Sequence, residues 1–267
     1  MSFINVRRQV QNLIALSAAS LILVGAPAQA DEYVALGDSA ASGNGTGNPD
    51  LDYNCFRSSD AYAPIIASER DNTQLKFVAC SGATTDDVVD SQIAALSKKT
   101  DFVTLSVGGN DVGFIELILN CGFYWDEWQC LHTADEIHRR IDEELPAKLD
   151  QAYAAIKKKA SKATIMNLGY PRFFGSDVSC WTARGITSTE AEALNGISDH
   201  LDRVIAGRAA QAGIIHLSVI EQFTGHDVCA ADPFVMGKDV TFLRDVYHPS
   251  KAGYRDGHMP LIRAIME

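Results

Sequence analysis

Residues 33–39 read Tyr-Val-Ala-Leu-Gly-Asp-Ser, a short apolar run that closes on a glycine and two polar residues. The run predicts a buried strand, and the glycine allows a sharp exit that leaves Ser39 just past the strand's carboxyl end. Ligands bind at that edge of an open α/β sheet, so the Ser39 hydroxyl is a candidate nucleophile. Glycine, aspartate and serine also favour ordinary turns, so this interpretation needs support from the rest of the chain.

Five apolar runs predict buried parallel strands, and segments of helical period separate them. Strands that alternate with helices imply right-handed crossovers and a parallel sheet covered by helices on both faces. The prediction is a three-layer α/β/α domain with a five-stranded parallel sheet, for which 2-1-3-4-5 is a common doubly wound order. The predicted strands cover residues 33–36, 75–79, 102–107, 163–168 and 214–219.

Four helices are predicted from their start signals and their apolar stripes. Two of them begin with a threonine and a glutamate three residues later, which is the spacing of a capping box. The two boxes are Thr133/Glu136 and Thr187/Glu190, and the other helices are predicted over residues 85–96 and about 250–265.

The first thirty residues have the composition of a targeting segment. Two arginines precede an apolar stretch over 13–26, and small residues at 28 and 30 offer a cleavage site. A retained membrane anchor is the alternative, but the stretch is short for a span and Pro27 follows it closely. We therefore predict a signal peptide over residues 1–30 and, because no linker or repeat divides the rest, one domain over residues 31–267.

The charge of the chain argues against one class of partner. The formal net charge is −11, and the predicted leader contributes only positive charge to it. A nucleic-acid-binding protein would need a basic face, and none is visible in the sequence. We expect a secreted, extracellular monomer that binds a small-molecule substrate, with no nucleic-acid partner and no stable membrane anchor after leader cleavage.

Six cysteines form an even set, all of them beyond the predicted leader. Fifteen pairings are possible, and the sequence alone does not choose among them. A metal site is the competing interpretation, but no Cys-x-x-Cys or compact Cys/His spacing is present, so we expect no metal. We favour pairing of neighbours, which closes local loops: Cys55–Cys80, Cys121–Cys130 and Cys180–Cys229.

Two connections between the predicted elements are long. Residues 40–74 contain the Gly/Asn-rich stretch 43–47, which lacks the lysine of a phosphate-binding loop and is predicted to be a flexible surface loop. Residues 111–132 are instead dense in aliphatic and aromatic side chains. They predict either a lined groove beside the site or a satellite core beneath a disulfide-closed loop.

The first three predicted strands end in loops that the doubly wound order brings together. The first loop carries Ser39, the second carries Gly82 and the third carries Asn110. The amides of Ser39 and Gly82 and the side-chain amide of Asn110 can aim at one oxygen, which is the composition of an oxyanion hole.

A base for the serine is found near the carboxyl end of the chain. Asp245 precedes His248 by three residues, close enough to fix the tautomer of the imidazole as in a Ser-His-Asp system. His226 is the one rival among the seven histidines, but Asp227 follows it directly, where orientation is poor.

These blocks together resemble the SGNH (GDSL) hydrolase family. The matching residues are Gly-Asp-Ser at 37–39, Gly82, Gly-Gly-Asn-Asp at 108–111 and Asp-x-x-His at 245–248, in the family's order. They span nearly the whole predicted mature chain. The leader and the six cysteines further resemble the secreted bacterial lipase/esterase branch, whose members carry three disulfides.

The resemblance implies a flavodoxin-like sheet order, an acyl-ester hydrolase activity and no metal or organic cofactor. It implies Ser39 as nucleophile, His248 as general base and acid, and Ser39, Gly82 and Asn110 as oxyanion donors. Some secreted relatives replace the triad acid with a main-chain carbonyl. Here Asp245 occupies the triad-acid position, which predicts a full triad.

The predicted function is a secreted serine ester hydrolase that works through an acyl-enzyme. The apolar and aromatic stretches at 114–128 and 170–174 favour lipid or fatty-acyl esters as substrates. The alternatives are an acyltransferase that passes the acyl group to a hydroxyl acceptor, an acetyl-carbohydrate esterase and a catalytically inactive binding module.

Overall fold

A computed structural model describes residues 30–123 and 126–267, so the predicted signal peptide lies almost entirely outside the described residues. Five parallel strands form one sheet in the order β2-β1-β3-β4-β5, which confirms the predicted fold class and strand order. The strands are β1 (Asp31–Ala35), β2 (Thr73–Phe77), β3 (Thr100–Leu105), β4 (Thr164–Leu168) and β5 (Ile215–Leu217).

The first three strands begin two residues before the apolar runs that predicted them. Polar residues such as Asp31 and Glu32 open β1, and they pair with Thr73 and Gln74 of β2 in parallel register. Ladder hydrogen bonds are made by the main chain, so a polar side chain at the rim of a sheet does not end the strand. The hydrophobic pattern therefore located each of these strands but placed its start too late.

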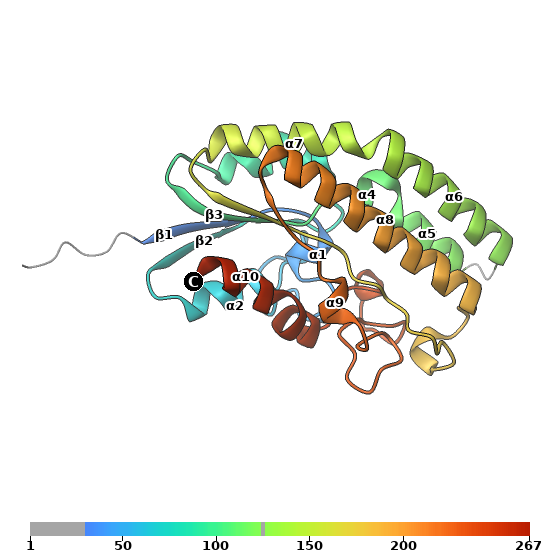
Figure 1. Ribbon diagram of the computed structural model, residues 1–267. Helices are drawn as coiled ribbons and strands as arrows, with labels where there is room; N and C mark the ends of the chain where they lie inside the picture. The colour runs from blue at the N-terminus through green and yellow to red at the C-terminus, as the bar shows by residue number, and fades with distance from the viewer. Residues whose placement is uncertain (1–29, 124–125) are drawn as a thin grey trace, which may run out of the picture.

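Side chains of β1 alternate between two separate cores. Val34 and Leu36 belong to the larger core, whereas Tyr33 and Ala35 belong to a smaller core on the other face of the sheet. Figure 1 shows α6, α7 and α8 covering one face and α2 and α10 covering the other. Because both faces are covered, β1 is buried throughout its apolar part, and its carboxyl end is held rigidly.

Short helical turns at the strand ends and long helices on the two faces complete the domain. Among the described residues, none of the helices combines the length and the hydrophobicity that crossing a bilayer would require. The helical segments are α1 (Ser39–Ser42), α2 (Tyr62–Glu69), α3 (Thr85–Asp90), η1 (Gln92–Ala95), α4 (Gly109–Val112), α5 (Phe114–Gly122), α6 (Glu127–Glu143), α7 (Leu145–Lys159), η2 (Trp181–Ala183), α8 (Ser188–Ala212), α9 (Ile220–Phe223), η3 (Leu243–Asp245), η4 (Gly253–His258) and α10 (Met259–Met266).

Only one of the two predicted capping boxes starts a helix. Thr187 and Glu190 form the reciprocal box at the start of α8. The prediction at Thr133 was wrong, because α6 begins earlier, where the Asp126 carboxylate accepts a hydrogen bond from the amide of Gln129. Thr133 lies inside α6 and donates its hydroxyl to the carbonyl of Gln129, a bond that satisfies it without ending the helix.

The Gly/Asn-rich stretch at 43–47 is not the flexible surface loop that its composition predicted. Gly43, Asn44, Gly45 and Thr46 are buried. The Tyr254 hydroxyl donates to the carbonyl of Asn44 at 2.8 Å. A Cβ on Gly45 would lie 2.2 Å from the carbonyl oxygen of Pro249, so glycine is needed there for close contact rather than for mobility.

Three disulfides link neighbouring cysteines along the chain: Cys55–Cys80, Cys121–Cys130 and Cys180–Cys229. The second bond joins the end of α5 to the start of α6, which closes the long connection after β3 on itself. Each bond is expected to stabilise the fold by about 2–4 kcal/mol by restricting the unfolded chain.

Peptide mapping under non-reducing conditions should recover these three linked pairs from the purified protein. The reduced and alkylated protein is the control and should release all six cysteine peptides singly. A crossed pair, such as Cys80 linked to Cys121, would contradict both the neighbour pairing and the local geometry described here.

Candidate active site

Two constraints fix the position of Ser39. Gly37 has φ +121°, and a Cβ there would lie 2.3 Å from the carbonyl oxygen of Ser106 at the end of β3. The buried side chain of Gln92 accepts from the Gly37 amide at 2.7 Å and donates to its carbonyl at 2.9 Å. The turn is thus clamped from both sides, and it presents Ser39 as the first residue of α1.

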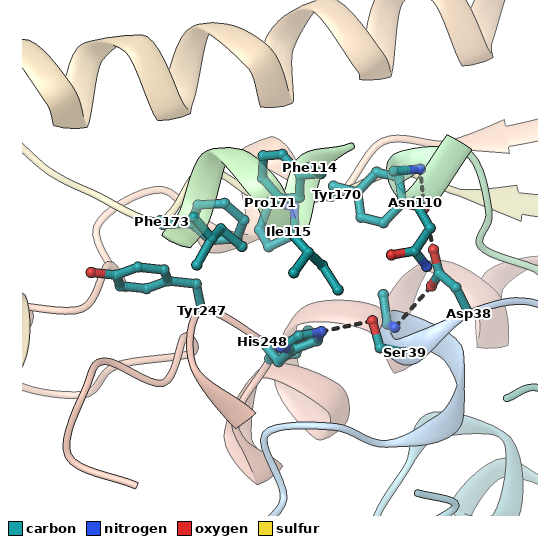
Figure 2. A pocket seen from close by; sticks show the side chains of 14 residues that line it. Asp38, Ser39, Asn110, Phe114, Ile115, Tyr170, Pro171, Phe173, Tyr247 and His248 are labelled. Atoms are coloured by element: carbon teal, nitrogen blue, oxygen red, sulfur yellow. Dashed lines mark hydrogen bonds between the residues drawn. The ribbon is translucent and has the colours of Figure 1, made fainter. Parts of the chain in front are cut away.

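Ser39 and His248 form the central contact of the site. The Ser39 Oγ lies 2.7 Å from His248 Nε2 (Figure 2). The carbonyl of Val246 accepts a hydrogen bond from Nδ1 at 2.9 Å. With the proton held on Nδ1, Nε2 is the free acceptor that can take the serine proton. Burial lowers the pKa of His248 to about 4, so the imidazole is a neutral base at ordinary pH.

Asp245 makes no hydrogen bond to the imidazole, which corrects the predicted full triad. Its Oδ1 accepts a hydrogen bond from the amide of Gly45 at 2.7 Å, and burial raises its pKa above the ordinary value. The carboxylate thereby ties the η3 turn to the buried glycine-rich stretch. Asp245 therefore has a structural role, and the main-chain carbonyl of Val246 is the group that orients His248.

A strained turn explains why the Val246 carbonyl, and not the Asp245 carboxylate, is bound to His248. Val246 has φ −58° and ψ 130°, Tyr247 has φ 53°, and the His248 amide donates to the carbonyl of Asp245 at 3.2 Å. These values are those of a type II turn, in which the third residue is normally glycine. A non-glycine residue there costs about 1–2 kcal/mol. Contacts of the Tyr247 ring with Phe173 and Phe174, at centroid distances of 5.8 and 5.2 Å, hold the residue in this conformation.

Of the three predicted oxyanion donors, the structure brings Ser39 and Asn110 to one cavity. Both line a small cavity of about 30 Å³ that His248 also lines. One hydrogen of the Asn110 side-chain amide is donated to the carbonyl of Ala83 at 2.9 Å, which leaves the second one free. Gly82 does not line this cavity; it lies in the loop after β2, directly before Ala83, whose carbonyl accepts the Asn110 hydrogen bond.

A buried tyrosine connects the nucleophile turn to the Asn110 turn. The hydroxyl of Tyr170 donates to Asp38 Oδ2 at 2.5 Å and accepts from the amide of Gly109 at 3.1 Å. Asp38 also accepts from the amide of Ala40 at 2.9 Å, and burial raises its pKa to about 7. Tyr170 therefore fixes the distance between the two loops that supply Ser39 and Asn110.

Sequence reasoning missed the positioning roles of Val246, Tyr247, Tyr170 and Gln92. Every residue has a main-chain carbonyl, so no residue motif marks the Val246 carbonyl as the group that orients His248. Tyr170 lies in the aromatic stretch at 170–174, which was interpreted through its apolar rings, so the hydrogen bonds of the Tyr170 hydroxyl were not predicted. A buried glutamine in a short helix gives no signal until its strand partner is known.

The long connection after β3 lines a cavity at the site, as one of the two interpretations predicted, and its buried residues join the main core instead of forming a satellite core. Phe114, Leu117 and Ile118 of α5 are buried in the larger core. Ile115 and Phe123 are partly exposed and line a cavity of about 300 Å³ that also contains Ser39 and His248. Tyr124 and Trp125 lie outside the described residues, and Trp128 is exposed rather than part of the groove.

The rival base and a metal centre find no support in the geometry. The His226 ring stacks on Phe234, and its Nδ1 pairs with the carbonyl of Asp232, away from both cavities that contain Ser39. In the part of the chain that the structure describes, no group of three or more His, Cys, Asp or Glu side chains is arranged to hold a metal ion.

Comparisons with known proteins agree with this geometry. The profile of the GDSL-like Lipase/Acylhydrolase family matches residues 35–255. The chain is 38% identical to Lipase 1 of Streptomyces coelicolor over 93% of this chain and 91% of that protein. It also resembles the crystal structures of phospholipase A1 from Streptomyces albidoflavus (TM-score 0.82, 36% identity) and of an extracellular lipase from Streptomyces rimosus (TM-score 0.83, 35% identity). Each alignment covers 88% of this chain and 99% of the other. The chain therefore belongs to the GDSL-like lipase/acylhydrolase family and is a hydrolase of carboxylic esters.

Proposed function

We propose that this protein is a secreted lipase that hydrolyses fatty-acyl esters through an acyl-enzyme on Ser39. The observation that carries the proposal is the 2.7 Å contact between Ser39 Oγ and a neutral His248 whose other nitrogen is bound to the Val246 carbonyl. Secretion is supported by the predicted leader, by the three disulfides and by the extracellular relative from Streptomyces rimosus.

The first step transfers the acyl group to the enzyme. His248 Nε2 takes the proton of Ser39, and Oγ attacks the ester carbonyl. The negative charge that develops on the carbonyl oxygen is held by the Ser39 amide, by the free hydrogen of the Asn110 side chain and by the Gly82 amide. The protonated imidazole then gives its proton to the departing alcohol.

The second step releases the acid. Water enters beside His248, loses a proton to Nε2 and attacks the acyl-enzyme, and Ser39 leaves with that proton. During both steps the imidazole carries a positive charge, which the Val246 carbonyl dipole stabilises through Nδ1.

The larger of the two cavities at Ser39, of about 300 Å³ and called the long cavity below, favours fatty-acyl chains over acetyl groups. Its walls are formed mainly by aliphatic side chains, among them Ile115, Leu119 and Leu243. Burial of each methylene is worth about 0.8 kcal/mol, so a longer chain binds better until the cavity is filled. An acetyl group would leave most of this volume empty.

Replacing the nucleophile tests the function directly. Ser39→Ala should abolish labelling by a fluorophosphonate probe and lower the hydrolysis of p-nitrophenyl esters by about 10⁴-fold or more, because no oxygen remains to form the acyl-enzyme. Wild type should hydrolyse long-chain esters better than the acetate across a C2 to C16 series. Ser161→Ala, at an exposed serine far from the cavities, is the matched control. Labelling that persists in Ser39→Ala would contradict the assignment.

The pH dependence of kcat/KM should report the low pKa of His248. The base is active when neutral, and its folded pKa of about 4 lies below the ordinary value, so activity should stay level from pH 7 down to about 5.5. Half of it should be lost near pH 4, in assays with a soluble short-chain ester and with circular dichroism to verify folding. An acid limb centred near pH 6.5 would show that burial does not shift this histidine.

Asp245→Asn separates a main-chain carbonyl from a triad acid. In chymotrypsin-type triads the corresponding change lowers kcat by about 10⁴-fold. Here we expect a loss of less than about tenfold, because the amide oxygen can still accept from Gly45 and His248 keeps its partner at Val246. His248→Ala, measured in parallel, should lose nearly all activity. Equal losses in the two variants would restore Asp245 to the triad.

A further inference from the structure

The long cavity beside Ser39 contains one charged group that ester hydrolysis does not use. Arg244, the middle residue of the η3 turn, lines this cavity together with Ser39 and His248. Among the described residues that line the two cavities at Ser39, Arg244 is the only cation, and the only acid is Asp38, which is already bound to Tyr170.

The guanidinium of Arg244 lies beside an aromatic ring and has no acidic partner among the described residues. It lies over the ring of Phe56 at 5.5 Å, and its backbone carbonyl accepts from the side chain of Asn44 at 2.8 Å. Its one side-chain hydrogen bond within the described chain is a long one, from Nη1 to the carbonyl of Asn54 at 3.5 Å. No carboxylate of the described residues lies within 4.0 Å of it as an ion pair.

A positioned guanidinium with unused donors is suited to a phosphate. Arginine presents five N–H groups in a rigid fork that matches phosphate oxygens two at a time, and stacking on an aromatic ring leaves the edge of the fork open. The whole chain has a net charge of −11. The exposed Arg244, which has no acidic partner among the described residues, gives this cavity a local positive charge.

We propose that Arg244 binds the phosphodiester of a glycerophospholipid while an acyl chain occupies the apolar part of the same cavity. This inference rests on the proposed function and names its substrate class. The three features of the cavity correspond to the three parts of such a lipid: aliphatic walls for the chain, Ser39 for the carboxylic ester and Arg244 for the phosphate. A neutral glyceride or an acetylated sugar has no anionic group for Arg244.

The phosphodiester takes no part in the chemistry. Ser39 attacks the acyl carbonyl, the lysophospholipid leaves as the alcohol with a proton from His248, and one water molecule then frees the fatty acid. Arg244 is therefore a specificity residue, and it is expected to act on the choice between charged and neutral lipids.

The test compares two water-soluble substrates that differ in the headgroup. The ratio of kcat/KM for dihexanoylphosphatidylcholine to that for dihexanoylglycerol is measured below the micelle concentration. In Arg244→Gln this ratio should fall by about tenfold or more, because a charge-assisted bond is lost for one substrate only. The ratio for Arg244→Lys should lie between those of wild type and Arg244→Gln, since lysine keeps the charge but not the forked set of donors.

Arg184→Gln is the matched control. Arg184 is exposed and stacked over Trp181 at 4.4 Å, and it lines neither cavity at Ser39, so the ratio should stay at the wild-type value. Turnover of both substrates with an unchanged ratio in Arg244→Gln would overturn the inference and leave the proposed function standing. If wild type hydrolysed neither substrate, both this inference and the proposed function would be overturned.

A binding measurement provides a readout that is independent of turnover. In the Ser39→Ala background, calorimetric titration with dihexanoylphosphatidylcholine should show a Kd that Arg244→Gln raises by about tenfold or more. Circular dichroism of each variant verifies that it is folded. An equal Kd with and without Arg244→Gln would contradict phosphate binding at this residue.

Discussion

The close approach of the Gly37 backbone to the end of β3 is the constraint on which the site depends. A Cβ at this position would lie 2.3 Å from the Ser106 carbonyl oxygen, so only glycine allows β1 to leave the sheet here. The exit sets Ser39 at the start of α1, and Gln92 then pairs with both polar groups of Gly37 as a neighbouring strand would. A displaced Ser39 would lose its contact with a histidine that approaches from the opposite end of the chain.

That histidine depends on a second constraint, the type II turn over 245–248. The turn places its strain at Tyr247 and directs the Val246 carbonyl toward Nδ1 of His248. Packing of the Tyr247 ring against Phe173 and Phe174 offsets the strain, in keeping with the tendency of strained residues to occur at functional sites. The carboxylate of Asp245, which the motif places in the triad, is used to hold the turn on the Gly45 amide.

Electrostatics divides the site into two regions. Around Ser39, burial keeps His248 neutral before reaction and raises the pKa of Asp38, whose oxygens are already bound by the Tyr170 hydroxyl and the Ala40 amide. At the mouth of the long cavity, Arg244 provides a positive charge on an aromatic support. The one cation that lines these cavities is thus placed where we propose that a substrate headgroup lies.

Local patterns of residue type, together with the family resemblance, were enough to predict the sheet order, one of the two capping boxes and the meeting of Ser39, His248 and Asn110 at one cavity. Main-chain pairing was invisible to those patterns, so strand starts were displaced and the buried stretch at 43–47 was taken for a surface loop. Only the tertiary structure decided that a carbonyl replaces Asp245 beside His248, that Tyr170 joins two loops and that Arg244 faces the cavity. Each of these contacts joins residues through backbone geometry or across distant segments, and neither leaves a signature in the order of residue types.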